Sequence, residues 1–363
     1  MTDDDRQRAA DTPAGDAEGE TGPAVRPVSS AEGPAAAGIA NPAAAGDSPP
    51  AGTAVEAATV ANSGTPAMPA GESGKKKRRG SNWISDLKAI LWLLLAVLVF
   101  HSCVAKPFYI PSESMMPGLL KGDRLVVSKY PYGWSWVSPS FHVFPHWQGR
   151  IWGAMPRRGD IVIVTPPDSS SDYIKRVIGL PGDTIQLIDG RVYLNGQPLR
   201  REARPDAMIP IDDNIDCKER AYVHRVLQNG RLFCQMRVFR EYIPDGGELR
   251  AYDTIDAVDN GDADEYPHDA TVYRVPEGRV FLMGDNRDDS ADSRFPAGRP
   301  SNGLGGAVPW ENIGGRAEFV TFSLDGSSSY WNPISWFTAM RGGRAGTSLH
   351  PESVPANQRA PRP

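Results

Sequence analysis

The sequence predicts a mainly β protein with one N-terminal transmembrane helix, and three features carry this prediction. Residues 89–105 are uncharged and largely Leu, Val, Ile and Ala. The length of this run is near the lower end of the range of about 17–25 apolar residues that can span a bilayer. Beyond them, short runs rich in Val and Ile alternate with turn residues. Such a pattern indicates an all-β architecture rather than alternating strands and helices. Asp189-Gly190, between two of these runs, is typical of a hairpin turn.

The segment before the apolar run predicts its orientation in a membrane. Residues 1–73 are mostly Ala, Pro, Gly, Ser and Thr and bury too little apolar surface to offset the entropy of ordering them. We therefore expect residues 1–80 to be a disordered tail, with a basic end at 75–79. The positive-inside rule places this tail in the cytoplasm, the anchor at 84–105 and the rest of the chain outside.

A cleaved signal peptide is the competing interpretation of the apolar run, because Cys103-Val104-Ala105 resembles a cleavage site. The run lies far from the N-terminus, however, which favours an uncleaved anchor. Cleavage at this point would also release the rest of the chain from the membrane.

Composition excludes several classes of function. The formal net charge is −5, so the chain lacks the basic character of a nucleic-acid-binding protein. Its three cysteines are too few for a disulfide scaffold, and neither they nor the six histidines have the spacing of a metal site. We therefore expect no nucleic acid partner, no metal and no cofactor.

The strands after the anchor are predicted from apolar runs bounded by turn residues. Residues 159–165 are nearly continuous Ile and Val, which indicates a strand buried on both faces. The aromatic stretch at 130–152 is either a loop folded on its own rings or an interfacial surface, since Trp and Tyr favour the headgroup region. Further strands are expected at 108–110, 124–129, 173–179, 184–188, 191–194, 279–283 and 316–324.

Residues 195–275 differ from their surroundings. They are polar and charged, with short strands expected at 238–242 and 271–275, and we interpret them as an inserted smaller subdomain. Cys217 and Cys234 both lie in this region. In an oxidising compartment outside the membrane they are expected to form a disulfide, a reduced pair being the alternative.

Residues 325–363 are expected to be a C-terminal tail. Within it, Tyr330 to Phe337 predicts a short amphipathic helix that either touches the bilayer or packs on the domain. The last twenty or so residues are expected to be disordered. No role is assigned to the Pro- and Gly-rich loop at 296–306.

Two stretches carry residues suited to nucleophilic chemistry. Residues 111–115 read Pro-Ser-Glu-Ser-Met, and Lys175 follows Ser114 by 61 residues. A hydroxyl is a poor nucleophile until a base takes its proton. A lysine can be that base only if burial lowers the pKa of its amine toward neutrality. Ile174 and Val177–Ile178 flank Lys175, and we expect them to exclude water from it.

Both stretches belong to a set of four that resembles one enzyme family. The set consists of residues 111–115, 158–162, 173–183 and 284–294. In this order, behind a membrane anchor, the four resemble those of the bacterial type I signal peptidases, also called leader peptidases. The likeness runs from about residue 84 to the 320s. Any one segment is a weak signal, whereas the ordered set is a strong one.

This resemblance implies a membrane-bound serine endopeptidase that removes signal peptides from secreted preproteins after small residues, in Ala-x-Ala-type sequences. Ser114 is then the nucleophile and Lys175 its base. The Ser114 backbone N–H and the Ser112 hydroxyl resemble the oxyanion donors, and Ser290 resembles the serine that orients the lysine amine. The positions that resemble substrate-pocket residues are Phe108, Ile110, Met115, Tyr173 and Ile174.

The resemblance also implies a supporting ion pair between Asp292 and Arg294. The membrane-anchored, β-rich catalytic domain would comprise residues 106–194 and 276–324, interrupted by the insertion. The enzyme would lie in the inner (plasma) membrane as a single-pass protein, with its N-terminus in the cytoplasm and its catalytic domain on the outer face. Its partners would be secreted preproteins and the lipid bilayer.

Two other classes of function are weighed against this one. A non-catalytic anchored scaffold would not need an intact Ser114 and Lys175. The second alternative is a specialised Ser/Lys protease, such as a conjugation-pilin processor or a self-cleaving repressor. A repressor needs a DNA-binding domain, which residues 1–80 do not offer. There is no Gly-x-Ser-x-Gly motif for a Ser-His-Asp enzyme. Residues 284–294 lack the closing glutamate of a calcium loop.

Overall fold

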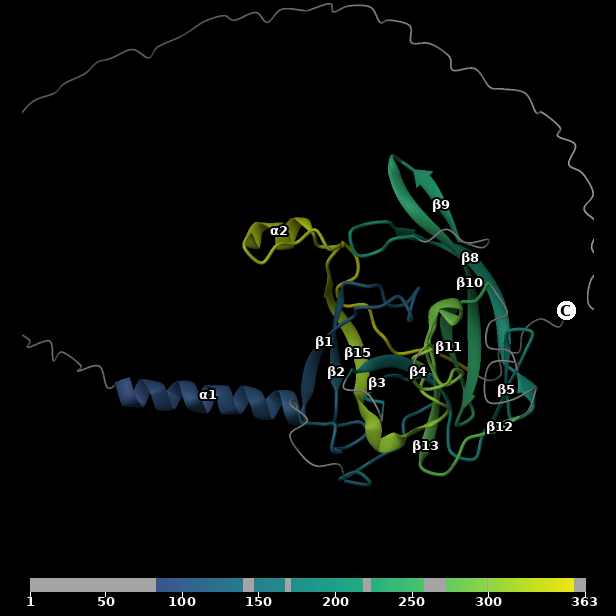
Figure 1. Cartoon of the computed structure of the whole chain (residues 1–363), viewed down its shortest axis with the longest axis horizontal. Helices are drawn as coiled ribbons and strands as arrows, with labels where there is room; N and C mark the ends of the chain where they lie inside the picture. The colour runs from purple at the N-terminus through teal and green to yellow at the C-terminus, as the bar shows by residue number, and fades with distance from the viewer. Residues whose placement is uncertain are drawn as a thin grey trace, which may run out of the picture. The chain divides into compact units, whose positions relative to one another are not determined.

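The computed structural model describes residues 83–139, 147–166, 171–217, 223–257, 272–298 and 300–355 (Figure 1). The expected tail at 1–80 and part of the aromatic stretch at 130–152 lie outside these residues. Within them the protein is mainly β, and helix α1 (Trp83–Cys103) is the one helix long and apolar enough to cross a membrane. The predicted class, mainly β with one apolar N-terminal helix, is confirmed. Ala105, expected at the end of the anchor, already begins strand β1 (Ala105–Tyr109).

A seven-stranded antiparallel sheet carries Lys175. Figure 1 labels β1, β2, β15, β3, β4 and β13 of this sheet. Its order is β1-β2-β15-β3-β4-β13-β14. All four residues of β3 (Ile161–Val164) are buried, as its continuous Ile and Val run predicts. Strand β4 (Tyr173–Gly179) lies between β3 and β13, so Lys175 sits in the interior of the sheet. The other strands are β2 (Asp123–Ser128), β13 (Arg279–Met283), β14 (Val308–Pro309) and β15 (Ile313–Ser323).

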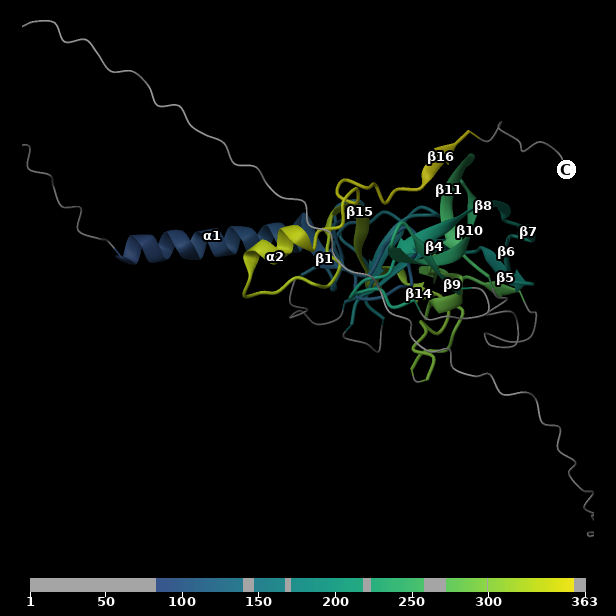
Figure 2. The same ribbon diagram turned by 90° about the horizontal axis from the view of Figure 1, so that it is seen from above.

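A second sheet comes mainly from the region interpreted as an insertion. Strand β10 (Arg231–Asp245) is its centre and pairs with β8, β9 and β11. It runs for 15 residues, so the short strand expected at 238–242 is only its middle. Figure 2 shows the C-terminal strand β16 beside β11. The bounds are β8 (Arg200–Pro210), β9 (Val223–Gln228), β11 (Glu248–Ile255) and β16 (Glu352–Val354).

A small third sheet follows β4 along the chain. Its order is β12-β5-β6-β7. Asp189 and Gly190 join β5 to β6 with φ angles of 48° and 68°, which is the backbone of the hairpin turn that their sequence predicts. The strands are β5 (Thr184–Ile188), β6 (Arg191–Leu194), β7 (Gln197–Pro198) and β12 (Tyr273–Arg274).

The two larger sheets pack through a common apolar core. One buried cluster contains Ile178 and Phe281 of the first sheet together with Ile243 and Tyr252 of the second. Another joins Met116, in the loop after β1, to side chains of β8, β10 and β11. Apolar contact is non-directional and scales with the area buried. The second sheet therefore stabilises the loop that carries Ser114 through its contacts with Met116.

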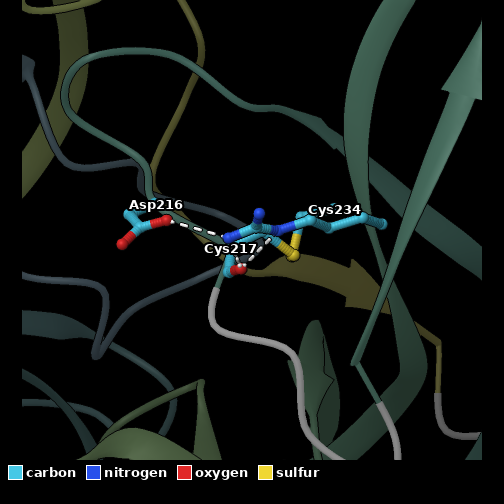
Figure 3. Close-up of a disulfide and its surroundings, with 4 residues drawn as sticks. Asp216, Cys217 and Cys234 are labelled. Atoms are coloured by element: carbon cyan, nitrogen blue, oxygen red, sulfur yellow. Dashed lines mark hydrogen bonds and ion pairs between the residues drawn. A yellow bond between two sulfur atoms is a disulfide. The ribbon is translucent and has the colours of Figure 1, made fainter.

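A disulfide crosses the part of this core nearest to that loop. Cys217 and Cys234 are bonded at an S–S distance of 2.05 Å, with their Cα atoms 5.5 Å apart (Figure 3). The bond closes a loop of 17 residues onto β10. Both cysteines belong to the buried cluster that contains Met116.

The C-terminal segment is more ordered than its sequence suggests. Helix α2 (Pro333–Thr338) begins after Asn332, whose side chain accepts a hydrogen bond from the Ile334 N–H. Downstream, Arg344 pairs with the buried Asp123 and β16 pairs with β11. The expectation that the last twenty residues are disordered is therefore wrong for residues 344–355, because ion pairs and strand pairing fix a segment with little apolar content.

Candidate active site

The Ser114 segment is a tight loop held by buried apolar side chains. Ile110 and Pro111 follow β1, and the loop returns to β2 through a hydrogen bond from the Gly122 N–H to the Ile110 carbonyl. Ile110 and Met115 are almost fully buried, which pins the chain on both sides of the serine. Ser114 itself is only 6% exposed. Burial of its neighbours thus fixes where the hydroxyl points.

Strand β4 brings Lys175 to this hydroxyl. Lys175 Nζ donates a hydrogen bond to Ser114 Oγ over 2.8 Å, so the structure brings together the two stretches that lie 61 residues apart in the sequence. The lysine side chain is buried. A nucleophile and a base within about 2.6–3.2 Å of each other have the geometry that nucleophilic catalysis requires.

Burial lowers the pKa of Lys175 from 10.5 to about 8, because a site with little water disfavours the ammonium form. The Asp292 carboxylate partly counters this by raising the pKa, and the Arg294 guanidinium lowers it again. A substantial fraction of Lys175 is therefore an uncharged amine at mildly alkaline pH, able to accept a proton.

Two further serines surround the pair. Ser112 Oγ lies 3.3 Å from Ser114 Oγ. Ser290 Oγ is buried and has no hydrogen-bond partner within the described ranges, so the bond from Lys175 that the resemblance implies is not formed here. A Cβ at Gly284 would lie 2.2 Å from Ser290 Oγ and 2.5 Å from the Ser114 carbonyl oxygen. Only glycine fits at 284, and its absence of a side chain lets the 284–294 segment approach Ser114.

The 284–294 segment is held in place by charged hydrogen bonds. Asp292 and Arg294 form a fully buried ion pair at 2.9 Å. Asp292 also accepts the Gly284 N–H over 2.8 Å, and Arg294 donates to the Arg287 carbonyl over 2.9 Å. These bonds compensate the buried charges of Asp292 and Arg294 for their loss of water, whereas the Ser290 hydroxyl of the same segment has no partner among the described residues.

Asn286 joins this segment to the nucleophile loop and was not singled out from the sequence. Its backbone N–H donates to the Ser114 carbonyl over 3.1 Å, and its side-chain amide donates to the Glu113 carbonyl over 3.1 Å. Its place beside Gly284 and Asp285 in the matched 284–294 segment is the signal that marks it. Asn286 acts through Ser114, so it is a positioning residue.

Two buried ion pairs beneath the site were also missed from the sequence. Arg176, next to Lys175, donates two hydrogen bonds of 2.6 Å to Asp285. Arg287 pairs with Glu241 of β10, and both side chains are 2% exposed. Glu241 lies 46 residues from its partner, in a strand with no matched motif, so nothing in the sequence points to it.

A pocket of about 390 Å³ opens over Ser114 and Lys175. Of the five predicted substrate residues, Tyr173 and Ile174 line it. Ile110 and Met115 do not line the pocket; they are almost fully buried in one apolar cluster with Ile174, and Phe108 packs against that cluster. Two of the five predicted residues therefore line the pocket, and the other three contribute only to the apolar cluster that contains Ile174. The other lining residues are Pro111, Ser112, Glu113, Ser171, Asp172, Asp289 and Ala291.

Comparison with known proteins found a matching family model, curated relatives and a solved structure with partial similarity. A family model described as signal peptidase, peptidase S26, matches residues 83–322. The chain is 34% identical over 254 residues to signal peptidase I of Rickettsia bellii (strain OSU 85-389), covering 69% of this chain and 76% of that protein. It is 35% identical over 240 residues to signal peptidase I of Rickettsia canadensis (strain McKiel), covering 66% and 79%. A crystal structure of a signal peptidase I from Enterococcus faecalis V583 aligns with 23% identity and a TM-score of 0.23, covering 45% of this chain and 97% of that one.

The buried Arg287–Glu241 pair gives a stability prediction. Glu241→Ala leaves the Arg287 guanidinium buried without its carboxylate, so the free energy of unfolding should fall by about 3–5 kcal/mol. Asp216→Ala breaks the ion pair between Asp216 and Arg225, whose side chains are 79% and 44% exposed respectively. This change should lower the free energy of unfolding by only about 0–1 kcal/mol. Urea denaturation of the full-length protein in detergent micelles, followed by tryptophan fluorescence, measures both. Equal losses of unfolding free energy in the two variants would show that the buried Arg287–Glu241 pair does not stabilise the fold more than an exposed pair does.

Proposed function

The chain belongs to the peptidase S26 family of signal peptidases, and we propose that it cuts signal peptides from secreted preproteins with a Ser114/Lys175 dyad. The family supports the serine endopeptidase activity. The 2.8 Å hydrogen bond between Lys175 Nζ and Ser114 Oγ is the observation that carries the dyad. The lowered pKa of Lys175 supports its role as the base.

The reaction begins with proton transfer. The uncharged Lys175 amine accepts the Ser114 proton while Ser114 Oγ attacks the scissile carbonyl carbon. The tetrahedral oxyanion accepts hydrogen bonds from the Ser114 backbone N–H and the Ser112 hydroxyl. Collapse breaks the C–N bond, and the Lys175 ammonium gives its proton to the leaving amine of the mature protein. Lys175 then takes a proton from water as the water oxygen attacks the acyl carbonyl. The acyl–Oγ bond breaks to free the signal peptide as a carboxylic acid, and the Lys175 ammonium returns a proton to Ser114 Oγ.

Three groups position the dyad in this proposal. Ser290 orients the lysine amine; its buried hydroxyl has no other partner in the described part of the chain, which leaves it free to accept a hydrogen bond from Lys175. The Asp292–Arg294 pair holds the segment that carries Ser290. Because Asp292 is bound to Arg294, its charge does not fully restore the ammonium form of Lys175.

We attribute specificity for Ala-x-Ala-type sequences to the walls of the pocket over the dyad. Tyr173 and Ile174 line the pocket, and Ile174 is held by its packing against the buried Ile110 and Met115. Large side chains would clash there, although one methylene discriminates by only about 1–3 kcal/mol. Strand β4 pairs with β13 from Arg176 to Gly179, and no pairing of residues 173–175 with β13 is described. An extended substrate can therefore add backbone hydrogen bonds along residues 173–175.

The membrane placement is part of the proposal. We infer that α1 anchors the protein in the inner (plasma) membrane with the basic segment at 75–79 in the cytoplasm and the catalytic domain on the outer face. Residues 106–194 and 276–324 form the catalytic domain and 195–275 its inserted subdomain. Ser114 lies only 11 residues after the end of α1, which suits a substrate that is itself held in the bilayer.

Removing either member of the dyad tests the proposal. Ser114→Ala should abolish cleavage of a preprotein to mature length, and Lys175→Ala should lower kcat by about 10²–10⁴-fold, the usual contribution of a general base. Lys129→Met is a matched control, because Lys129 is also buried with a pKa lowered to about 8 but donates to the Ser138 carbonyl instead. Gel assay of the full-length protein in detergent measures all three. Full activity in Lys175→Ala would eliminate the dyad.

The pH dependence follows from the sign of the Lys175 shift. The active form is the uncharged amine, so its fraction rises as pH rises toward a pKa of about 8. kcat/KM should therefore increase about tenfold per pH unit on the acid side and level off above about pH 8. Initial rates on a peptide without titrating groups, between about pH 6 and about pH 10, give the profile. A rate that falls from about pH 6 to about pH 8 would rule out a neutral lysine as the base.

A further inference from the structure

A stacked arginine lies on the face of the first sheet that turns away from the active site. Tyr109 of β1, Arg124 of β2 and Phe322 of β15 are direct cross-strand partners. The Arg124 guanidinium carbon lies 4.2 Å from the Tyr109 ring centroid and 6.0 Å from that of Phe322. Neighbouring side chains on a strand point to opposite faces. Because Phe108 packs on the core beneath Ser114, this row faces the other way.

Arg124 has no anionic partner within the described ranges. Its guanidinium forms no ion pair, and its Nη1 atom is shielded from solvent without a hydrogen-bond acceptor. The nearby Arg341 and Arg344 differ, since each is paired with an aspartate, Asp212 and Asp123 respectively. A donor that has lost water without gaining an acceptor is unfavourable. The arrangement is therefore suited to an anion that is not part of the described chain.

The guanidinium lines a pocket of about 220 Å³. Phe322, Asn214 and Ser328 also line it, and so do Tyr330 and Trp336 at its edge. An arginine held between aromatic rings presents its N–H groups in a fixed fork that matches the oxygens of a phosphate or carboxylate. The pocket thus combines one fixed positive charge with polar groups and an aromatic edge.

The edge of this pocket continues into an exposed aromatic segment. Tyr330, Trp331 and Phe337 are 87%, 95% and 78% exposed, and Ile334 is 72% exposed. Tyr330 and Trp336 meet edge-on at 6.2 Å. Tryptophan and tyrosine exposed together at this density favour the headgroup region of a bilayer. An anion bound beside them would be a lipid headgroup rather than a group on a soluble molecule.

We propose that the Arg124 pocket binds the phosphate of an anionic phospholipid while the segment 330–337 inserts its aromatic side chains beside it. The proposal rests on the membrane-anchored placement given under the proposed function. A second attachment of this kind, in addition to α1, would restrict rotation of the catalytic domain about its anchor. The dyad would then be held at a set orientation to substrates in the same bilayer.

Native mass spectrometry of the full-length protein in an uncharged detergent tests this site. With an equimolar mixture of phosphatidylglycerol and phosphatidylcholine, the wild type should retain one phosphatidylglycerol molecule preferentially. Arg124→Gln should need about tenfold more phosphatidylglycerol for the same occupancy, since a charge-assisted hydrogen bond is lost. Arg191→Gln removes the same charge from an exposed position on β6 and should behave as the wild type. Equal retention by Arg124→Gln and the wild type would overturn the proposal.

Two further arms separate the other outcomes. Millimolar inorganic phosphate alone should not occupy the site; phosphate binding that is lost in Arg124→Gln, without any lipid preference, would identify a free-phosphate site and contradict the lipid assignment. If Arg124→Gln does not fold, Arg124→Lys keeps the charge but loses the planar fork and should still weaken lipid retention at least about threefold. Cleavage of a soluble peptide is measured on the same samples. It should be unchanged in these variants, so that failure of the lipid site is distinguished from failure of the proposed peptidase.

Discussion

The structure depends on one amine that is removed from water without being given a counterion. Three buried arginines of β4 and the 284–294 segment each have a carboxylate of their own: Arg176 with Asp285, Arg287 with Glu241 and Arg294 with Asp292. Lys175, in contrast, forms no ion pair within the described part of the chain, and its amine donates to the Ser114 hydroxyl. Each buried guanidinium thus has a carboxylate to compensate its charge, while the absence of a partner allows burial to lower the pKa of the lysine. Selective pairing thus separates the structural cations from the proposed catalytic base.

The second sheet supplies one of the carboxylates that pair with these buried arginines. Glu241 of β10 reaches under the 284–294 segment to Arg287, and Arg250 of β11 binds Asp160 next to β3. These contacts join the region interpreted as an insertion to the strands that hold the dyad. Breaking a buried pair leaves an uncompensated charge, so the positions of the two sheets are coupled. The proposed insertion therefore supports the active site rather than standing apart from it.

Sequence patterns predicted the local structure better than the long-range contacts. The strands at 173–179, 184–188, 191–194 and 279–283 were predicted at their observed bounds, because continuous apolar runs and an Asp-Gly turn determine them locally. The pairing of Ser114 with Lys175 was expected from a family resemblance, not from spacing. Glu241 and the fixing of residues 344–355 were not predictable, since charged partners far apart in the sequence leave no periodic signal. Asn286 was within a matched segment, but its two contacts are with backbone carbonyls, whose positions only the fold reveals.

The protonation state of Lys175 in the folded protein tests the account most directly. Full-length protein with ¹³C- and ¹⁵N-labelled lysine, in detergent micelles, gives an NMR titration for each amine. The Lys175 signal is assigned by its loss in Lys175→Ala and is distinguished from the other buried amine with Lys129→Met. We predict a titration midpoint of about 8 for Lys175. A midpoint near the ordinary lysine value of about 10.4 would contradict the account, because the Lys175 amine would then be almost entirely charged at neutral pH and could not take the Ser114 proton.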